Sequence, residues 1–384
     1  MIHRTSLKSL QRSILEYPVT VVTGPRQSGK TTLLRSLKDY RYVSLEDPDN
    51  RAYAEDDPRG FLSEYDTKVI LDEVQNVPKL FSYIQGIVDN SGIMGQYILS
   101  GSQNFNLMER ITQSLAGRAD ILELLPLDLS ELRLNKLLPK DPYKLCAKGF
   151  YPAIYNREID ATRYYANYIT TYINRDVTQL INLHDNNSFR KCLKICASRA
   201  GQLVNYNHMA RDVGVSHTTL RNWLSILETS YIIHFLQPYY KNYAKRVIKS
   251  PKLYFWDTGV LSYLLGIRNG NLQTTHSSWG AIFENLIITE FKKKSAHEAL
   301  FKEYWFWRDS KGHEVDLLSL NDQGNLDIIE IKSSSTIKTD HFKGLDYFEK
   351  ISRESPIFKN LIYGGIRDQS RTKVEVKAWH NLFR

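Results

Sequence analysis

The sequence has few cysteines, and this limits the chemistry available to it. Only three of its 384 residues are cysteines, Cys146, Cys192 and Cys196. So few thiols exclude a disulfide framework and predict a reducing, cytoplasmic location. Cys192 and Cys196 lie four residues apart on an expected helix, but no nearby Cys or His supplies the further ligands that zinc requires. We therefore expect the thiols to be buried as small apolar side chains.

Long hydrophobic runs are also absent. The longest apolar stretch, residues 226–240, is interrupted by Glu228 and His234 and is too short and too polar to span a bilayer. Residues 6–16 show an amphipathic helical pattern in place of a signal peptide. No internal repeat or low-complexity segment is present. These patterns predict a soluble protein with no membrane partner.

The charge is unbalanced towards the positive side. The net charge is +9 and the pI is about 9.1, while 42% of residues are hydrophobic and 24% are charged. Such a composition is ordinary for a globular protein of two or three domains. A basic protein favours an acidic partner, and nucleic acid is the commonest one. Charge alone does not decide the matter, because many basic enzymes never contact DNA.

The first third of the chain alternates short apolar runs with helical segments, which predicts a parallel sheet with crossover helices. Its expected strands are residues 19–23, 42–45, 68–71, 96–99 and 121–124. The middle third, from about residue 126 to 266, has a mostly helical pattern. The last third begins with a helix at residues 281–294 and continues with expected strands at 304–308, 314–318 and 326–332.

A phosphate-binding motif follows the first expected strand. Residues 24–31 match G-x-x-x-x-G-K-[ST] in full, and a helix-like run from 32 to 38 follows. The glycines let backbone N–H groups surround phosphate oxygens, Lys30 would contact the β- and γ-phosphates of ATP, and the Thr31 hydroxyl would bind Mg²⁺. The expected nucleotide-binding residues in this segment are Gly24, Pro25, Arg26, Gln27, Ser28, Gly29, Lys30, Thr31 and Thr32.

An acidic pair completes the expected site. Residues 69–71 are apolar, as in a strand covered on both faces, and Asp72 then emerges at the carboxyl end, where open α/β sheets bind ligands. Its carboxylate would hold Mg²⁺. Glu73 is placed to polarise the water that attacks the γ-phosphate. Taken alone, the glycine loop could be a plain turn and the Asp-Glu pair a solvated strand end. Both alternatives would have to apply together, with the two motifs in this order and at this spacing.

Two further residues are candidates for the nucleotide site. Ser102 follows the strand at 96–99 and would lie beside the γ-phosphate if this strand neighbours the one that ends at Asp72. The alternative is an ordinary turn. Arg118 would act as an arginine finger for this subunit or for a neighbouring one, which leaves a homo-oligomer open. The alternative is an ordinary surface arginine.

Five short segments together resemble a known family. They are GPRQSGKT (24–31), LDEVQ (71–75), LSGSQ (99–103), SLAGR (114–118) and the closing EVDLL with EIK (314–318, 330–332). The chain resembles the prokaryotic AAA-type ATPases of the AAA_14 plus DUF4143 architecture, over nearly its whole length. The resemblance implies an ATP-binding core of the additional-strand, catalytic-glutamate P-loop class and implies little about the substrate. Gly101, Ser102 and Gln103 stand where the family more usually has GSS.

A helix-turn-helix is predicted in the middle of the chain. Asn207 and Ser216 are suitable N-caps for two helices separated by Gly214. The expected core positions are Ala210, Val213, Val215, Leu220, Trp223, Leu224 and Leu227. In a DNA-binding winged helix, the residues facing the major groove would be His217, Thr218, Thr219, Arg221 and Asn222. A basic stretch with tyrosines, residues 239–252, would suit phosphate contacts. The alternative is a packing module with a solvated charged face.

The end of the chain carries acidic residues in an order that resembles the PD-(D/E)xK pattern of restriction endonucleases. Glu330 and Lys332 project to one face of an expected strand, Asp316 lies on the preceding strand, and Glu284 lies on the helix before both. In a nuclease, Asp316 and Glu330 would bind a second Mg²⁺ or Mn²⁺, Lys332 would position water, and Glu284 would support them. A surface ion pair on a solvated strand is the alternative.

Together these patterns predict an α/β fold class with three domains. They are a P-loop ATPase (AAA-type) domain at 1–128, a helical and winged-helix domain at 129–265, and a restriction-endonuclease-like α/β domain at 266–384. The first hypothesis is a Mg²⁺-dependent ATPase that acts as a nucleotide-driven switch on double-stranded DNA, with nuclease activity left open. The alternative is a nucleotide-gated protein-interaction or regulatory module with an inactive nuclease-like domain.

Overall fold

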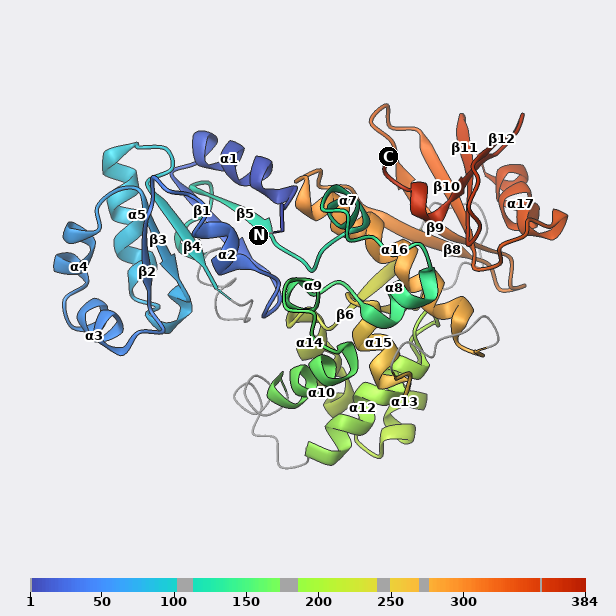
Figure 1. Ribbon diagram of the computed structural model, residues 1–384, viewed down its shortest axis with the longest axis horizontal. Helices are drawn as coiled ribbons and strands as arrows, with labels where there is room; N and C mark the ends of the chain where they lie inside the picture. Colours follow the sequence, from blue (N-terminus) through green and yellow to red (C-terminus); the bar gives the residue numbers. More distant parts are fainter. Residues whose placement is uncertain (1, 102–112, 173–185, 240–248, 269–275, 353) are drawn as a thin grey trace. The chain divides into compact units, whose positions relative to one another are not determined.

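The computed structural model describes residues 2–101, 113–172, 186–239, 249–268, 276–352 and 354–384. The chain divides into two compact units (Figure 1). Unit 1 comprises Met1–Leu127 with two short later segments, Thr229–Tyr231 and Lys293–Leu300. Unit 2 comprises Asp128–Glu228, Ile232–Lys292 and Phe301–Arg384. In the part of the chain that is described, no helix has the length and apolar character needed to cross a membrane.

Unit 1 is built on a five-stranded parallel sheet with the order β2-β3-β4-β1-β5. Its strands are β1 (Val19–Thr23), β2 (Arg41–Ser44), β3 (Val69–Asp72), β4 (Tyr97–Ser100) and β5 (Ala119–Glu123). All five were predicted, β1 residue for residue and the others within two residues of their ends. Strand β4 lies between β1 and β3, which is the additional strand that the family resemblance implied.

Helices cover both faces of this sheet because its strands are apolar on both sides. Val21, Leu71 and Leu99 belong to one core cluster with residues of α3 (Pro48–Asp56), α4 (Pro58–Glu64) and α5 (Leu80–Ser91). Val22, Ile70 and Ile98 belong to another, with residues of α1 (Ser6–Glu16) and α2 (Lys30–Leu34). The sheet edge where the strands end is left for polar side chains, as in other open α/β sheets.

Unit 2 begins with helices packed around tyrosines. They are α7 (Leu129–Leu134), α8 (Pro142–Lys148), α9 (Pro152–Asn156), α10 (Ala161–Tyr172) and α15 (Thr258–Leu264). The hydroxyl of Tyr151, a fully buried side chain, donates to that of Tyr168 at 2.7 Å. Two further phenol groups bond to the backbone, because Tyr155 donates to the carbonyl oxygen of Gly149 at 2.7 Å and Tyr165 to that of Lys148 at 3.1 Å.

The predicted helix-turn-helix corresponds to α13 (Tyr206–Val213) and α14 (His217–Thr229), preceded by α12 (Asn186–Ser198). The expected core residues are buried except Val215, which is half-buried. Ser216 caps α14, since its hydroxyl accepts from the Thr219 N–H at 3.0 Å. The prediction that Asn207 caps the first helix is wrong. Asn205 is the cap, with extended backbone and a side chain that accepts from His208 N–H at 3.0 Å, while Asn207 lies within the first turn.

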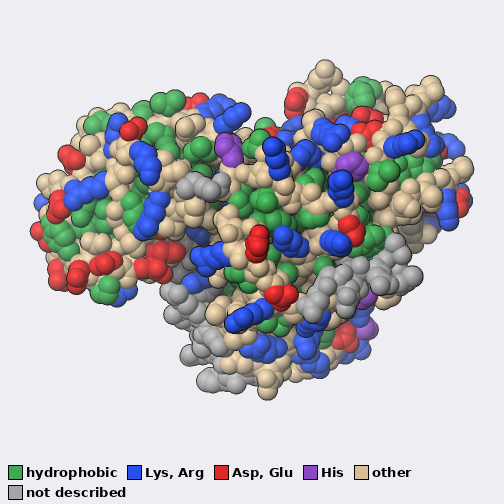
Figure 2. All heavy atoms as spheres, viewed as in Figure 1, with side chains coloured by type: hydrophobic (Ala, Val, Ile, Leu, Met, Phe, Trp, Pro, Cys, Tyr) green, Lys and Arg blue, Asp and Glu red, His purple; other side chains and the backbone are tan. Residues whose placement is uncertain are grey.

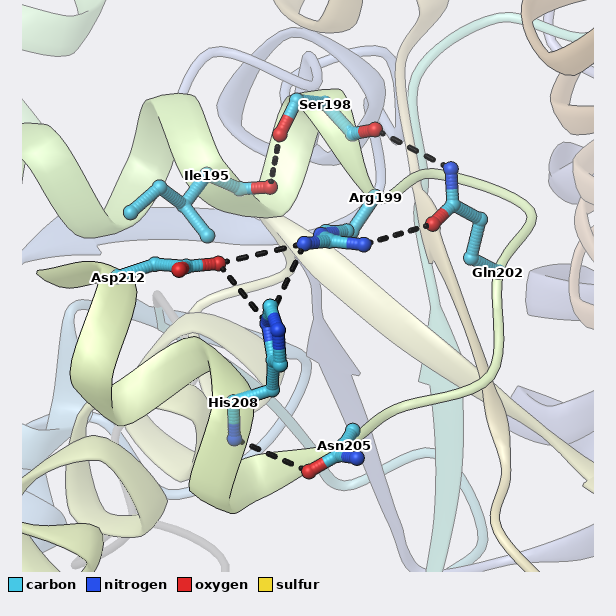
Figure 3. A network of polar contacts seen from close by, with 7 residues as sticks. All are labelled: Ile195, Ser198, Arg199, Gln202, Asn205, His208 and Asp212. Atoms are coloured by element: carbon cyan, nitrogen blue, oxygen red, sulfur yellow. Dashed lines mark hydrogen bonds and ion pairs between the residues drawn. The ribbon is translucent and has the colours of Figure 1, made fainter.

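A charged network joins α12 to α13 (Figure 3). Arg199, just beyond the end of α12, donates to the Asp212 carboxylate at 3.3 Å, and His208 Nδ1 lies 3.3 Å from the same oxygen. Burial raises the pKa of Asp212, but the hydrogen bond from Arg199 and the interaction with His208 together lower it by more, so it lies below its usual value. All three groups are substantially exposed, so the network orients the two helices more than it stabilises them.

An eight-stranded mixed sheet completes unit 2, in the order β12-β13-β11-β10-β9-β8-β6-β7. Strands β6 (Ile233–Pro238) and β7 (Lys252–Phe255) follow the helix-turn-helix and pair antiparallel, and β6 pairs with β8 (Tyr304–Arg308). The remaining strands are β9 (Glu314–Leu320), β10 (Leu326–Lys332), β11 (Ile357–Tyr363), β12 (Gln369–Ser370) and β13 (Glu375–Ala378). Helices α16 (Trp279–His297) and α17 (Lys343–Ile351) accompany this sheet. The sheet was predicted only in its strands β8, β9 and β10.

Candidate functional site

The loop after β1 requires glycine at two positions. Gly24 and Gly29 have φ angles of +139° and +101°, in a region that other residues rarely adopt. A Cβ atom on Gly24 would lie 2.2 Å from the carbonyl oxygen of Leu124, the residue that follows β5. The loop thus combines a special backbone conformation with close packing against the neighbouring strand end, and α2 begins immediately after it.

Lys30 lies inside this loop. Its side chain is 7% exposed, and Nζ donates to the carbonyl oxygens of Gly24 at 2.9 Å and of Pro25 at 3.0 Å. Burial lowers the pKa of Lys30 to about 8, although the charges of Glu73 and Asp72 oppose the shift. The ammonium group is therefore hydrogen-bonded to neutral carbonyl acceptors, and a nearby anion would stabilise its positive charge.

Asp72, at the end of β3, accepts hydrogen bonds from three hydroxyl groups. Thr31 Oγ1 donates to Oδ2 at 3.0 Å, Tyr42 donates to the same oxygen at 2.5 Å, and Ser100 donates to Oδ1. Burial and the hydrogen bond to Asp72 raise the pKa of Tyr42 to about 12. The parallel register explains the convergence, because Asp72 is paired with Ser100 on one side and Ser44 on the other.

Glu73 follows with an unusual backbone conformation. Its φ angle is +56°, in the left-handed region, so the chain turns sharply after β3 and both carboxylates remain at the sheet edge. The side chain amide of Gln75 donates to the Glu73 carboxylate. Strain of this kind at a polar strand end is common in functional sites.

A hydroxyl group inside the loop is left without a hydrogen-bond partner. Ser28 is fully buried, and its Oγ has no partner among the described residues. Unpaired buried polar atoms are rare and costly. A phosphate oxygen would satisfy this donor, so the loop fits an anion by its chemistry as well as by its glycines.

Two residues that the sequence motifs missed support the loop. Arg4 is 6% exposed and donates to the carbonyl oxygens of Ser28 and Leu125, both at 2.7 Å. Tyr231, which clusters with unit 1, donates to Glu123 at 2.9 Å and lies 3.3 Å from the hydroxyl of Thr23, the residue before the loop. Burial, and then the charge of Glu123, raises the pKa of Tyr231 well above its usual value. Neither residue belongs to a motif, so only the fold reveals them.

Arg118 lies away from the loop. Arg118 lies beside Ala119, which pairs with Val19 at the amino end of β1, roughly 13 Å of strand from the carboxyl end where the loop begins. Its guanidinium pairs with Asp89 on α5, with Nη2 at 2.9 Å. Arg118 therefore cannot serve its own loop. Thr32 is exposed on α2, and Ser102 lies outside the described residues.

In unit 2, the structure brings together the predicted acids at the end of the chain and adds two residues. Oxygen atoms of Glu284, Glu314 and Asp316 lie within 4.8 Å of one another, and Lys252 pairs with Glu284 at 2.9 Å and with Glu314. Burial, with the charges of Glu330 and Glu284, raises the pKa of Asp316 well above its usual value. Lys332 pairs with Glu330, as the two-residue spacing predicts. Glu314 was not predicted as part of the site. Lys252 was expected in the basic stretch that would contact phosphates, but it is buried and paired with these acids.

The predicted DNA-facing residues lie in the first two turns of α14 (His217–Thr229). His217, Thr218, Arg221 and Asn222 are exposed, and Thr219 is half-buried because it contacts Ser216. Arg221 donates to His217 at 3.3 Å and lies over the Tyr206 ring, 4.5 Å from its centroid.

Comparison with known families divides the chain into three regions. Residues 16–133 match an AAA domain (AAA_14), residues 140–271 match a domain of unknown function (DUF8612), and residues 279–381 match another (DUF4143). Among solved structures, the Walker-type ATPase of Pyrococcus abyssi is 15% identical over 69% of this chain and 96% of its own, with a TM-score of 0.44. AMPPCP-bound DnaA from Aquifex aeolicus is 19% identical over 58% of this chain and 85% of its own, with a TM-score of 0.28.

Two curated relatives are closer in sequence. They are the uncharacterized proteins Rv2008c of Mycobacterium tuberculosis and Mb2031c of Mycobacterium bovis, each 30% identical over 340 residues. The alignment covers 87% of this chain and 74% of each relative. The resemblance inferred from the five motifs is thus confirmed. The chain belongs to the same family as these two mycobacterial proteins, and it combines an AAA-type ATPase domain with a DUF4143 region.

Proposed function

We propose that this protein binds and hydrolyses ATP with Mg²⁺, and that it acts as a nucleotide-driven switch on DNA. The observation that carries the proposal is the 3.0 Å hydrogen bond from Thr31 to Asp72, which joins the end of the phosphate loop to the acidic end of β3. A hydroxyl and a carboxylate at this separation are suitable ligands for one Mg²⁺ ion, directly or through water.

The residues around the loop fit a triphosphate. The unpartnered Ser28 hydroxyl offers a hydrogen-bond donor, and Lys30 would exchange its carbonyl partners for phosphate oxygens. Bound Mg²⁺ would neutralise the charge that develops on the phosphates. Glu73 would accept a proton from the attacking water, and Gln75 would hold its carboxylate in place.

Variants of the loop test the ATPase proposal. Lys30→Ala should abolish ATP binding, measured by titration calorimetry, and Glu73→Gln should retain binding but lose turnover by about 100-fold or more. Lys38→Ala is the matched control, because Lys38 is exposed beyond the end of α2. Unchanged ATP binding in Lys30→Ala would refute the proposal.

The DNA part of the proposal rests on the elements around α14. Helices α12, α13 and α14 are followed by the β6–β7 hairpin, and Leu203, between α12 and α13, forms an antiparallel bridge to Lys252 of β7. A helix, a short strand, a helix-turn-helix and a hairpin in this order are the elements of a winged helix. On the face drawn in Figure 2, Lys and Arg side chains are scattered without forming one continuous patch. The proposal of DNA binding therefore rests on the exposed residues of α14 and not on the overall charge.

Salt-dependent binding tests this part. Duplex DNA should bind with a steep dependence on salt concentration, and Arg221→Ala should weaken binding by roughly tenfold. Lys194→Ala, which removes an exposed positive charge from α12, is the control. Duplex DNA should also raise ATP turnover. ATP binding without any DNA affinity, accompanied by a change in oligomeric state, would favour the alternative of a nucleotide-gated protein-interaction module.

A further inference from the structure

The acidic groups near the end of the chain surround a cation that belongs to the protein itself. We call Glu284, Glu314, Asp316 and Glu330 the acid cluster. Lys252 is 2% exposed, and its Nζ lies 2.9 Å from Glu284 Oε1 and pairs with Glu314 Oε1. The sequence pattern that predicted a nuclease-like site includes Lys332 but not Lys252, which lies 80 positions earlier in the chain.

The backbone of Lys252 is fixed from two sides. It is the first residue of β7, where it pairs with Leu236 of β6, and it also forms the bridge to Leu203. The next residue is held as well, because Leu253 accepts from Gly201 N–H at 2.8 Å and donates to Gln202 at 3.2 Å. In the sheet, β6 is followed by β8 and then by β9, the strand that carries Glu314 and Asp316. The side chain is therefore directed into the cluster by sheet pairing.

Most carboxylate oxygens of the acid cluster already have partners. Glu284 Oε1 also accepts from the Tyr254 hydroxyl at 2.6 Å, and Glu314 Oε2 pairs with Arg308 at 3.1 Å. Asp316 Oδ2 accepts from the backbone N–H of Ile331 at 2.8 Å. Glu330 pairs with Lys332 through Oε1, and its Oε2 is buried without a hydrogen-bond partner among the described residues.

Lys252 forms ion pairs with two carboxylates in this environment. The residue is 2% exposed, and its ammonium group lies between Glu284 Oε1 and Glu314 Oε1. A Mg²⁺ ion bound by carboxylates of Glu284 and Glu314 would have to lie about 2.0–2.1 Å from oxygens that Lys252 already contacts. The two positive charges would then be in near contact in a buried place.

We propose that Lys252 is the resident cation of the acid cluster and excludes divalent metal from it. The inference goes beyond the proposed ATPase function and does not depend on it. The acid cluster would then keep the arrangement of a metal site without holding a metal, and the region would not cleave DNA by metal-dependent hydrolysis while Lys252 remains in place.

Manganese binding to the full-length, nucleotide-free protein tests the proposal. Bound Mn²⁺ is counted by electron paramagnetic resonance in the wild type, Asp316→Asn, Lys252→Met and the Lys252→Met/Asp316→Asn double variant. The phosphate loop is the same in all four, so its contribution cancels. Wild type and Asp316→Asn should bind equally, whereas Lys252→Met should gain one Mn²⁺ per chain that the double variant loses. Lys249→Met, an exposed lysine three residues earlier, should behave as wild type.

Thermal unfolding gives a second measurement. Mn²⁺ at about 100 times its Kd should raise the Tm of Lys252→Met by roughly 5 °C and leave that of the wild type unchanged. If Lys252→Met does not fold alone, Mn²⁺ should restore folding, and a chain that stays unfolded in Mn²⁺ would count against the proposal. A Mn²⁺ ion in the wild type that Asp316→Asn removes would overturn it. A folded Lys252→Met protein that gains no Mn²⁺ would overturn it too.

Discussion

Individual side chains of the phosphate loop are arranged for a charge that they do not themselves supply. Lys30 is buried with only neutral carbonyl acceptors in direct contact, and the Ser28 hydroxyl has no partner among the described residues. An anion within the loop would satisfy both groups. The missing negative charge can be detected, because ATP binding is expected to change the protonation of Lys30.

Proton uptake is therefore expected when ATP binds. Free Lys30 has a pKa of about 8, lowered by burial, and bound phosphate would raise it. At pH 8.5 about three quarters of the free protein carries neutral Lys30, so binding should take up about three quarters of a proton. Below pH 7 this contribution disappears, because Lys30 is already charged.

Calorimetry in buffers of different ionisation enthalpy measures this uptake. The phosphates of ATP are fully ionised at pH 8.5, so the proton would be assigned to the protein. ATP binding at that pH without proton uptake would show that Lys30 does not receive the phosphates, whatever the affinity.

At the scale of elements, the N-terminal segment supports the loop through one residue. Arg4 joins the loop at Ser28 to the chain after β5 at Leu125 through two 2.7 Å hydrogen bonds from a buried guanidinium. Arg4→Met should weaken ATP binding roughly tenfold, because hydrogen bonds from a charged group contribute about 1.5–3 kcal/mol. Arg4→Lys should not restore binding, since a single ammonium group lacks the fork that reaches both carbonyls.

The control for this prediction lies on α1. Arg12→Met removes an exposed arginine that pairs with Glu16, one turn away on the same helix, so ATP affinity should not change. ATP titrations of the three variants suffice. Equal affinity in Arg4→Met and the wild type would mean that the glycine loop holds its conformation without the arginine.

A second support comes from the segment that follows α14. Tyr231→Phe removes a buried hydroxyl bonded to Glu123 and close to Thr23. Urea unfolding should show a loss of about 1 kcal/mol in the free energy of unfolding, whereas Tyr83→Phe, at an exposed tyrosine of α5, should show none. No difference between the two variants would mean that solvent replaces the Tyr231 hydroxyl at no cost.

Local patterns predicted the elements well where one segment decides its own structure. The apolar run of β1, the phosphate loop and the strands β8 and β10 all follow from consecutive residues. The cap of α13 was misassigned because Asn205 and Asn207 are both good caps, and the choice depends on where the chain leaves the bridge at Leu203. The strands β6, β7 and β11 to β13 were not predicted. The place of β6 in the sheet depends on its pairing with β8, which comes much later in the chain.

The functional site, like the fold, could be predicted only where its residues are contiguous in the sequence. Lys30, Thr31, Asp72 and Glu73 were found because their motifs are contiguous, and the fold brings Thr31 and Asp72 together as expected. Arg4, Tyr42, Tyr231 and Lys252 were missed because each acts through a contact made across the fold. Sequence spacing carries no signal for such contacts without knowledge of the strand order.

At the scale of the whole molecule, substitution of Arg118 tests whether the ATP site is complete within one chain or is shared between two subunits. It lies at the amino end of β5, whereas the phosphate loop follows the carboxyl end of β1, so it cannot reach its own nucleotide. Arg118→Ala should therefore leave the Kd for ATP unchanged within about twofold, as judged by titration calorimetry. A clear loss of affinity would contradict this placement.

Turnover gives the second half of this test. If ATP hydrolysis also survives in Arg118→Ala, then the pair with Asp89 is only a surface contact, which contributes little to stability. If hydrolysis is lost, the arginine must act on the nucleotide of another subunit. Mixing Arg118→Ala with Lys30→Ala should then restore activity, because one chain supplies an intact loop and the other an intact arginine. Lost turnover that mixing does not restore would exclude a shared site in trans.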